Sequence, residues 1–320
     1  NDIGRLAQGV GTRMPRGNNT IFFIPKSKVP YTKKVTYGRL VSTIRLLKKE
    51  THRVRLTVGG DRLEYVGDAS STCAALTTVK MLLNSVISTA KARFGTIDIK
   101  DFYYGTPLSD YEYMRMPINI IPDEIIQQYN LQQIVVDGFV YIEIQKGMPG
   151  LKQAGRIAND RLVNHLAPHG YFPVKHTASL WKHDTNSVIF ALVVDDFGVK
   201  FSNPKHFDHL LHALESLYTV TVDRTGSKYL GLTIDWNYTS HNKHVDISMP
   251  NYVSAALHKF KHKPPSRPCH APHAWNKPTY GSKTQLAPTN DTSPLLPTSQ
   301  TRHIQAIVGT FLYYALAIDL

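Results

Sequence analysis

The sequence predicts an α+β protein built on antiparallel strands, and three observations lead to that fold class. Two apolar runs rich in Val and Phe, 188–194 and 197–201, each have the length of a buried strand and meet at Asp195-Asp196. Helical spacing of apolar residues at 76–90 leads into another strand pattern around Asp98. With 320 residues and 42% hydrophobic content, the chain is long enough for two or three subdomains.

The N-terminal part contains two strand patterns. Residues 20–24 form a short apolar run closed by Pro25, and a basic tract follows. Residues 53–58 alternate basic and apolar side chains, which predicts a strand with Arg53 and Arg55 on one face.

The middle of the chain predicts a helix, a strand and then a hairpin. The helix at 76–90 is expected to pack beneath a sheet and to lead into a strand at 97–99. We expect a less regular insertion to begin at 114–117. A hairpin of strands 134–136 and 139–144 should close it, because Asp-Gly at 137–138 favours a tight turn.

Helices and one hairpin dominate the remainder. A glycine-rich break at 147–150 precedes a helix whose inward residues are Leu151, Ala154, Ala158, Leu162 and Leu166. Asn203 before Pro204 predicts an N-cap, and the helix that follows should bury Phe207, Leu210, Leu211, Leu214 and Leu217. A strand at 229–236 with a partner at 245–249, and helices at 252–260 and 302–316, complete the pattern.

The aspartates carry the chemical signal. Adjacent carboxylates at the end of buried strands repel each other and lose solvation, so a cation would offset their cost. Asp-Asp is also common in solvated hairpin turns, so a turn that binds no metal stays open as an alternative. Asp98 makes the pattern more specific, because two-metal phosphoryl transfer needs carboxylates from separate strands.

Several segments occur in a fixed order along the chain. They are HRVRLTVGG at 52–60, FGTIDIKDFYYG at 94–105, GLKQAG at 150–155, ALVVDDFGV at 191–199, KYLGL at 228–232 and IVGTFLYY at 307–314. The first five resemble the reverse transcriptase of copia-type LTR retrotransposons, and the sixth resembles the segment before the family's RNase H domain. The resemblance implies a right-hand polymerase with an antiparallel palm sheet, fingers and a partial thumb.

The resemblance also implies a division of the chain. Residues 1–50 would be an N-terminal extension or fingers edge, 51–222 fingers and palm, and 223–262 a primer-grip hairpin with a partial thumb. A Pro-, Ser- and Thr-rich linker would occupy 263–300, and 301–320 would begin the connection toward RNase H. The chain reads as an internal piece of a polyprotein with integrase upstream and RNase H downstream.

Roles for individual residues follow from the same resemblance. Asp98, Asp195 and Asp196 would hold Mg²⁺ or Mn²⁺, with Asp98 and Asp195 the most direct ligands and Asp196 tuning the site. The expected nucleotide-binding residues are Arg53, Arg55, Asp101, Tyr103 and Gln153, and the expected primer grip is Tyr229, Leu230 and Gly231. Each has a plainer alternative: a solvated strand face for the arginines, a packing ring for Tyr103, a first-turn residue for Gln153 and an ordinary turn for the grip. Asp101 stands where the family usually has a small residue.

Composition agrees with this interpretation without deciding it. A net charge of +13 suits a nucleic-acid partner such as an RNA/DNA template-primer, although ribosomal or membrane-surface proteins are also basic. Two cysteines suit a reducing interior, and no apolar run is long enough to span a membrane. The cysteine usage predicts an intracellular protein, and the resemblance implies cytoplasmic virus-like particles and dNTPs as substrates.

Two alternatives and one possible metal site stay open at this stage. The chain can be a catalytically dead remnant that only binds nucleic acid, or, more distantly, a nuclease with clustered carboxylates. The His and Cys residues near the linker match no standard zinc-finger spacing; they are His258, His262, Cys269, His270 and His273.

Overall fold

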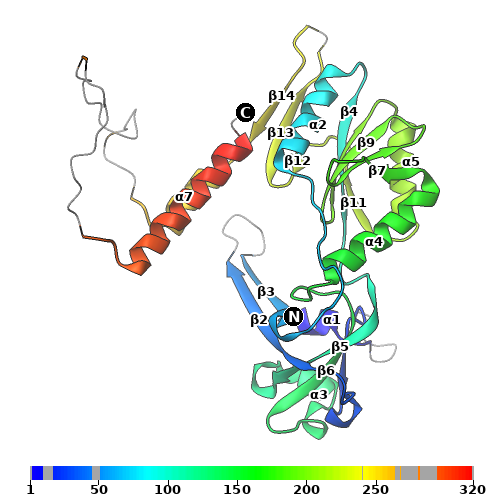
Figure 1. Ribbon diagram of the computed structural model, residues 1–320, viewed down its shortest axis with the longest axis vertical. Helices are drawn as coiled ribbons and strands as arrows, with labels where there is room; N and C mark the ends of the chain where they lie inside the picture. The colour runs from blue at the N-terminus through cyan, green and yellow to red at the C-terminus, as the bar shows by residue number, and fades with distance from the viewer. Residues whose placement is uncertain are drawn as a thin grey trace. The chain divides into compact units, whose positions relative to one another are not determined.

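A computed structural model of the protein describes residues 2–9, 17–44, 51–239, 241–263, 267, 280–281 and 294–318. The chain forms two compact units, Asn1–Ile247 and Ser248–Leu320, and each is described by itself. The first unit contains both large sheets (Figure 1). It also contains the three aspartates.

A five-stranded sheet carries the N-terminal part of the first unit. Its strand order is β1 (Ile21–Ile24), β6 (Phe139–Lys146), β5 (Pro107–Pro117), β2 (Val35–Ile44) and β3 (His52–Val58). The strands predicted at 20–24 and 53–58 are confirmed as β1 and β3. Helices α1 (Asp2–Leu6) and α3 (Asp123–Gln128) add Ile3, Leu6 and Ile125 to the apolar cluster of this sheet.

The predicted start of the insertion at 114–117 is wrong, because these residues end a long strand, β5 (Pro107–Pro117), and the short helical turns follow only from Ile118. Glu112, Tyr113 and Met114 are three consecutive buried residues, so the strand shows no regular two-residue period. The pattern therefore gave no strand signal. The strand predicted at 134–136 is also wrong: a 3-10 turn covers Leu131–Gln133, Val136 makes only an isolated bridge to Phe139, and β6 pairs with β5 instead.

The six-stranded sheet contains the predicted Asp-Asp hairpin. Its order is β11 (Val220–Asp223), β4 (Arg93–Ile99), β10 (Asp196–Phe201), β9 (Val188–Val193), β8 (Leu180–His183) and β7 (Tyr171–Pro173). Helices α4 (Ala154–Leu166) and α5 (Pro204–Glu215) share one apolar cluster with this sheet, while α2 (Leu76–Ser88) lies against β9 and β10 on its other side (Figure 1).

The helix signals of this part hold with one exception. The predicted inward face of α4 is buried, and Asn203 caps α5 by accepting a hydrogen bond from the Lys205 amide (3.0 Å). Leu217 was expected to face inward but is exposed, because α5 ends at Glu215 and the chain then turns toward β11.

A small third sheet corrects the strand expected at 229–236. It consists of β12 (Lys228–Tyr229), β13 (Leu232–Asn237) and β14 (His244–Ser248), and the last of these was predicted as a hairpin partner. Leu230 and Gly231 both have positive φ, 52° and 82°, and form a tight two-residue turn between β12 and β13. Short 3-10 turns complete the unit at Lys26–Lys28, Gly60–Arg62, Ile118–Ile120, Leu131–Gln133 and Ala167–His169.

The second unit contains the two C-terminal helices. The predicted helices are confirmed as α6 (Tyr252–Lys259) and α7 (Thr298–Ile318), and the Tyr252 hydroxyl donates to the Thr310 carbonyl (3.0 Å). Most of the linker predicted at 263–300 lies outside the described residues, as do Cys269, His270 and His273. Of the helices in the described ranges, none combines the length and the apolar character that crossing a bilayer requires.

Candidate metal centre

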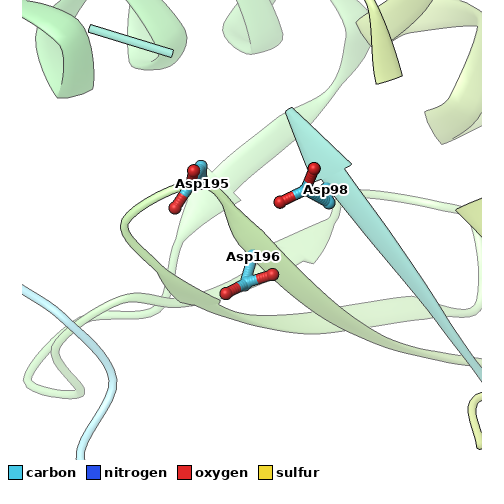
Figure 2. A group of neighbouring side chains, drawn as sticks. All are labelled: Asp98, Asp195 and Asp196. Carbon is cyan, nitrogen blue, oxygen red and sulfur yellow. The ribbon is translucent and has the colours of Figure 1, made fainter. Parts of the chain in front are cut away.

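Asp98, Asp195 and Asp196 converge at one end of the six-stranded sheet. Asp98 lies near the end of β4, directly opposite Asp196 in the antiparallel β4–β10 pair, and Asp195 precedes β10 in the hairpin turn. Each residue offers a carboxylate oxygen, and these oxygens lie within 4.8 Å of one another. Figure 2 shows the three side chains around a common space.

The β9–β10 turn fixes where Asp195 lies. Val193 pairs with Asp196, so Val194 and Asp195 form a two-residue loop, and Val194 has φ of 60°. A turn with positive φ at its first central residue normally uses glycine, and a β-branched residue there costs on the order of 1–3 kcal/mol. The Ile99 amide donates to the Asp195 carbonyl (3.0 Å), which ties the turn to the end of β4.

The carboxylates are difficult to ionise together. Burial, followed by the charges of Asp195 and Asp98, raises the pKa of Asp196 to about 6. Burial likewise raises the pKa of Asp195, with Asp98 adding to the effect, and it raises the pKa of Asp98 against the opposing charge of Lys100. The centre therefore favours either a bound proton or a bound cation.

The residues present fit a divalent metal ion. Within the described part of the chain, none of the three carboxylates forms an ion pair or accepts a hydrogen bond from another side chain, so their oxygens are free to coordinate. Carboxylate oxygens are the ligands that hard cations prefer. Mg²⁺ or Mn²⁺ as the specific ion stays a prediction.

Tyr103 and Asp101 lie on the turn that follows β4. Tyr103 is half-buried and packs against the apolar clusters of both large sheets, and burial followed by the charge of Asp195 raises its pKa. Asp101 has φ of 53°, and its carboxylate forms an ion pair with Arg5 (2.5 Å). The carboxylate is thus engaged in an ion pair, and nucleotide binding by Asp101 stays a prediction.

Arg55 is, besides Lys100, a basic residue whose charge acts on the carboxylates. It is exposed on β3, and its charge acts on Asp195 to oppose the rise of that pKa. Arg53 lies two residues away on the same face of the strand, opposite Thr43 of β2. The structure therefore connects Arg55, and not Arg53, electrostatically with the carboxylates.

Gln153 lies in a buried polar pair that the sequence did not predict. It immediately precedes α4, is only 4% exposed, and its amide donates to the carboxylate of Glu112 on β5 (3.0 Å). Burial raises the pKa of Glu112. No local signal places Glu112 in the core, because its neighbours Tyr113 and Met114 are both buried and the strand lacks a two-residue period.

Tyr229 is hydrogen-bonded to the backbone of the β9–β10 hairpin. Its ring is 3% exposed, and its hydroxyl donates to the carbonyls of Ala191 (2.9 Å) and Asp196 (3.4 Å). Leu230 and Gly231 form the turn that follows. Among the described residues, the three aspartates are the one group of acidic, His or Cys side chains close enough to share a metal, and His258 and His262 do not join such a group.

Comparison with known proteins gives one partial similarity. A protein of Saccharomyces cerevisiae described as "Putative transposon Ty5-1 protein" is 30% identical over 116 residues. This similarity suggests a retrotransposon-related protein. The matched stretch covers 36% of this chain and 37% of the yeast protein. No protein-family profile matches the chain.

Proposed function

We propose that this protein is an RNA-directed DNA polymerase of a retrotransposon polyprotein, which transfers a nucleotide from a dNTP to a primer 3′-hydroxyl. The observation that carries the proposal is the meeting of Asp98, Asp195 and Asp196 from two adjacent strands. The yeast similarity supports a retrotransposon origin, and the ordered sequence segments support the polymerase class.

The carboxylates would hold two divalent ions. Such ions supply Lewis acidity for a hydroxyl nucleophile and neutralise charge on the departing pyrophosphate. The chain's part is to keep three oxygens close together on a rigid sheet. The Ile99-to-Asp195 and Tyr229-to-Asp196 hydrogen bonds serve that purpose, because they fix the backbone of the hairpin that carries two of the ligands.

Two further side chains have roles in binding the nucleotide. Arg55, whose charge already acts on Asp195, would bind triphosphate oxygens through its planar guanidinium. Tyr103, held between two apolar clusters, would present its ring to the sugar and exclude a ribose 2′-hydroxyl. The buried position of Gln153 favours a supporting role beneath the nucleotide site.

Primer extension on an RNA template tests the proposal. We expect wild-type protein to extend a DNA primer with dNTPs and Mg²⁺ or Mn²⁺, and Asp195→Asn to lose about a hundredfold or more of that rate, since a ligand loss removes several kcal/mol of transition-state stabilisation. Asp137→Asn is the matched control, because Asp137 is an exposed turn residue with φ of 54° that Asn tolerates.

Two outcomes would contradict the proposal. Undiminished extension by a folded Asp195→Asn protein removes the metal-site assignment. Salt-sensitive binding of primer-template by wild-type protein, with no extension under any divalent ion, makes the nonenzymatic nucleic-acid-binding remnant the better account.

A further inference from the structure

Helix α1 joins two elements of the proposed nucleotide site. It lies against β3, the strand that carries Arg55, and Ile3 and Leu6 anchor it in the apolar cluster of the five-stranded sheet (Figure 1). Its polar side contains Asp2 and Arg5, which form an ion pair (2.9 Å). The resemblance assigns this part of the chain only to an extension or fingers edge, so neither residue has an assigned role.

Asp2 connects the helix to the strand. One of its carboxylate oxygens accepts a hydrogen bond from the Leu56 amide at the edge of the sheet (2.8 Å), and the other accepts two from the Arg5 guanidinium (2.9 and 3.2 Å). The Asp2 side chain is only 10% exposed, so solvent screens these contacts less than it screens a surface pair. Leu56 follows Arg55 directly, and the bond therefore fixes the backbone beside that arginine.

Arg5 connects the helix to the turn after β4. Its Nη1 donates to the Asp101 carboxylate (2.5 Å), and its guanidinium lies 4.8 Å from the centre of the Tyr104 ring. The Gly105 amide closes the turn by donating to the Asp101 carbonyl (2.7 Å), and Tyr103 lies within it. One planar guanidinium thus bridges two carboxylates over a ring, a geometry that a lysine ammonium does not reproduce. The Asp101 side chain is half-exposed, so this pair orients the turn more than it stabilises the fold.

Electrostatic effects place both arginines near one side chain. Burial raises the pKa of Tyr104, and the charge of Asp2 adds to the rise. The charges of Arg5 and Arg55 oppose it. Arg55 also opposes the raised pKa of Asp195. The ion pairs of Arg5 therefore lie close to the residues proposed to bind the triphosphate and the sugar.

We propose that Arg5 is a positioning residue for nucleotide selection. Through Asp2 it holds the backbone beside Arg55. Through Asp101 it holds the turn that presents Tyr103. The triphosphate site and the sugar site consequently keep one spacing. This inference rests on the proposed polymerase function.

The metal centre does not depend on Arg5. The aspartate hairpin is held by hydrogen bonds from the Ile99 amide and the Tyr229 hydroxyl, and neither of these groups contacts α1. Loss of Arg5 should therefore change nucleotide binding and selection more than it changes the rate of the chemical step.

Steady-state primer extension with dNTP and with rNTP tests the proposal. In Arg5→Leu, KM for dNTP should rise about fivefold or more, and incorporation of rNTP relative to dNTP should rise by a similar factor. The kcat for dNTP should stay within about twofold of wild type. KM and the incorporation ratio do not depend on the concentration of active enzyme, so partial unfolding of a variant does not move them.

Asp2→Asn perturbs the same contacts from the other end. Asparagine still accepts from the Leu56 amide but carries no charge for Arg5, so the incorporation ratio should shift in the same direction. Arg5→Leu/Asp2→Asn should shift the ratio no further than Arg5→Leu does, because the two side chains act as one unit. A purely structural role of these residues predicts an unchanged ratio.

Arg224→Leu is the matched control. Arg224 also forms an ion pair with an aspartate, Asp208 (2.6 Å), and its guanidinium lies 5.3 Å from the centre of the Phe207 ring. It follows β11 at the end of that strand remote from the turn after β4. This variant loses the same kinds of contact and should keep the wild-type KM and incorporation ratio.

Hydrogen exchange tests the coupling without any chemistry. The amides of Gly105 and Thr106 donate to the carbonyls of Asp101 and Tyr103 within the turn. In Arg5→Leu they should exchange about fivefold faster or more than in wild-type protein, because the turn opens more often. Arg224→Leu should leave their exchange unchanged.

The outcomes separate this inference from the proposed function. Absence of extension by wild-type protein contradicts the polymerase assignment, and hydrogen exchange alone then decides whether Arg5 holds the turn. Extension with an unchanged KM and ratio in Arg5→Leu overturns the inference while the polymerase assignment stands. Equal shifts in Arg5→Leu and Arg224→Leu also overturn it, as does unchanged exchange of the turn amides in Arg5→Leu.

Discussion

At the scale of single residues, the sequence predicts the aspartates well because their chemistry is unusual. Three carboxylates near strand ends have few stable arrangements, and the structure brings oxygens of Asp98, Asp195 and Asp196 within 4.8 Å of one another. Glu112 was missed for the opposite reason. A lone glutamate in a strand is normally solvated, and only tertiary packing against Gln153 makes it a buried acceptor.

The raised pKa of Asp196 predicts that the free energy of unfolding of the metal-free protein depends on pH. Its native pKa of about 6 exceeds the ordinary 3.8, so the native state holds the proton more tightly than the unfolded chain does. Stability of the metal-free protein should therefore fall as pH rises from about 4 through about 6. Asp196→Asn should recover about 1–2 kcal/mol at pH 7.5 and little at pH 3.5, after allowance for partial exposure.

Urea unfolding with and without Mg²⁺ measures both parts of this prediction. Mg²⁺ should stabilise wild-type protein at pH 7.5 more than it stabilises Asp196→Asn, while Asp137→Asn should behave as wild type. If Asp196→Asn is less stable than wild type at pH 7.5 without metal, the ionised Asp196 carboxylate does not destabilise the native state.

Tyr103 offers a residue-level test of sugar selection. Tyr103→Val removes the ring that is held between two apolar clusters and that would exclude a ribose 2′-hydroxyl. Incorporation of rNTP relative to dNTP should therefore rise about tenfold or more. Tyr103→Phe keeps the ring and should keep the discrimination. Competition between the two nucleotides in primer extension gives the ratio, and an unaltered ratio in Tyr103→Val would assign the ring to packing alone.

At the scale of elements, the sequence predicts those helices and hairpins that are determined by residues close together in the chain. The hairpin of β9 and β10, the capped start of α5 and the buried face of α4 are all visible in the sequence. Pairing partners are not, because they depend on distant segments: β6 pairs with β5 and not with its own neighbour at 134–136. The turn at Leu230 was also missed, because leucine is not a typical turn residue even though Leu230 has φ of 52°. The sequence therefore predicted one strand at 229–236 where the structure has a turn.

The Glu112–Gln153 bond predicts how firmly β5 is joined to α4. Glu112→Ala leaves the buried Gln153 amide without its partner and should lower the free energy of unfolding by about 1–3 kcal/mol. Glu112→Gln restores an acceptor without a charge and should cost much less. Equal losses in the two variants, measured by urea unfolding at pH 7.5, would mean that the hydrogen bond contributes nothing.

At the scale of the whole molecule, the first unit contains every group on which the proposed function depends. The apolar clusters described for it are formed by residues between Ile3 and Val222, and the aspartates, Arg55 and Arg5 all lie within Asn1–Ile247. The second unit is different in character. Of its described residues only Ala256 and Ala317 are buried apolar residues, and α7 exposes Ile304, Val308 and Leu312.

This contrast predicts that the first unit folds and binds metal without the second. Removing residues 251–320 keeps β14 and all of the described clusters, so the shortened protein should unfold cooperatively within a few degrees of the full chain, because about 1 kcal/mol shifts the midpoint by only a few degrees in a protein of this size. Mg²⁺ should raise its unfolding temperature at pH 7.5 as it does for the full chain, and Asp195→Asn should abolish that rise in both. The deletion also removes the exposed apolar face of α7, so the shortened protein should aggregate less on heating. Thermal unfolding followed by circular dichroism, with light scattering recorded alongside, measures all three effects. A shortened protein that no longer unfolds cooperatively would mean that α6 and α7 supply stability that the clusters of the first unit lack.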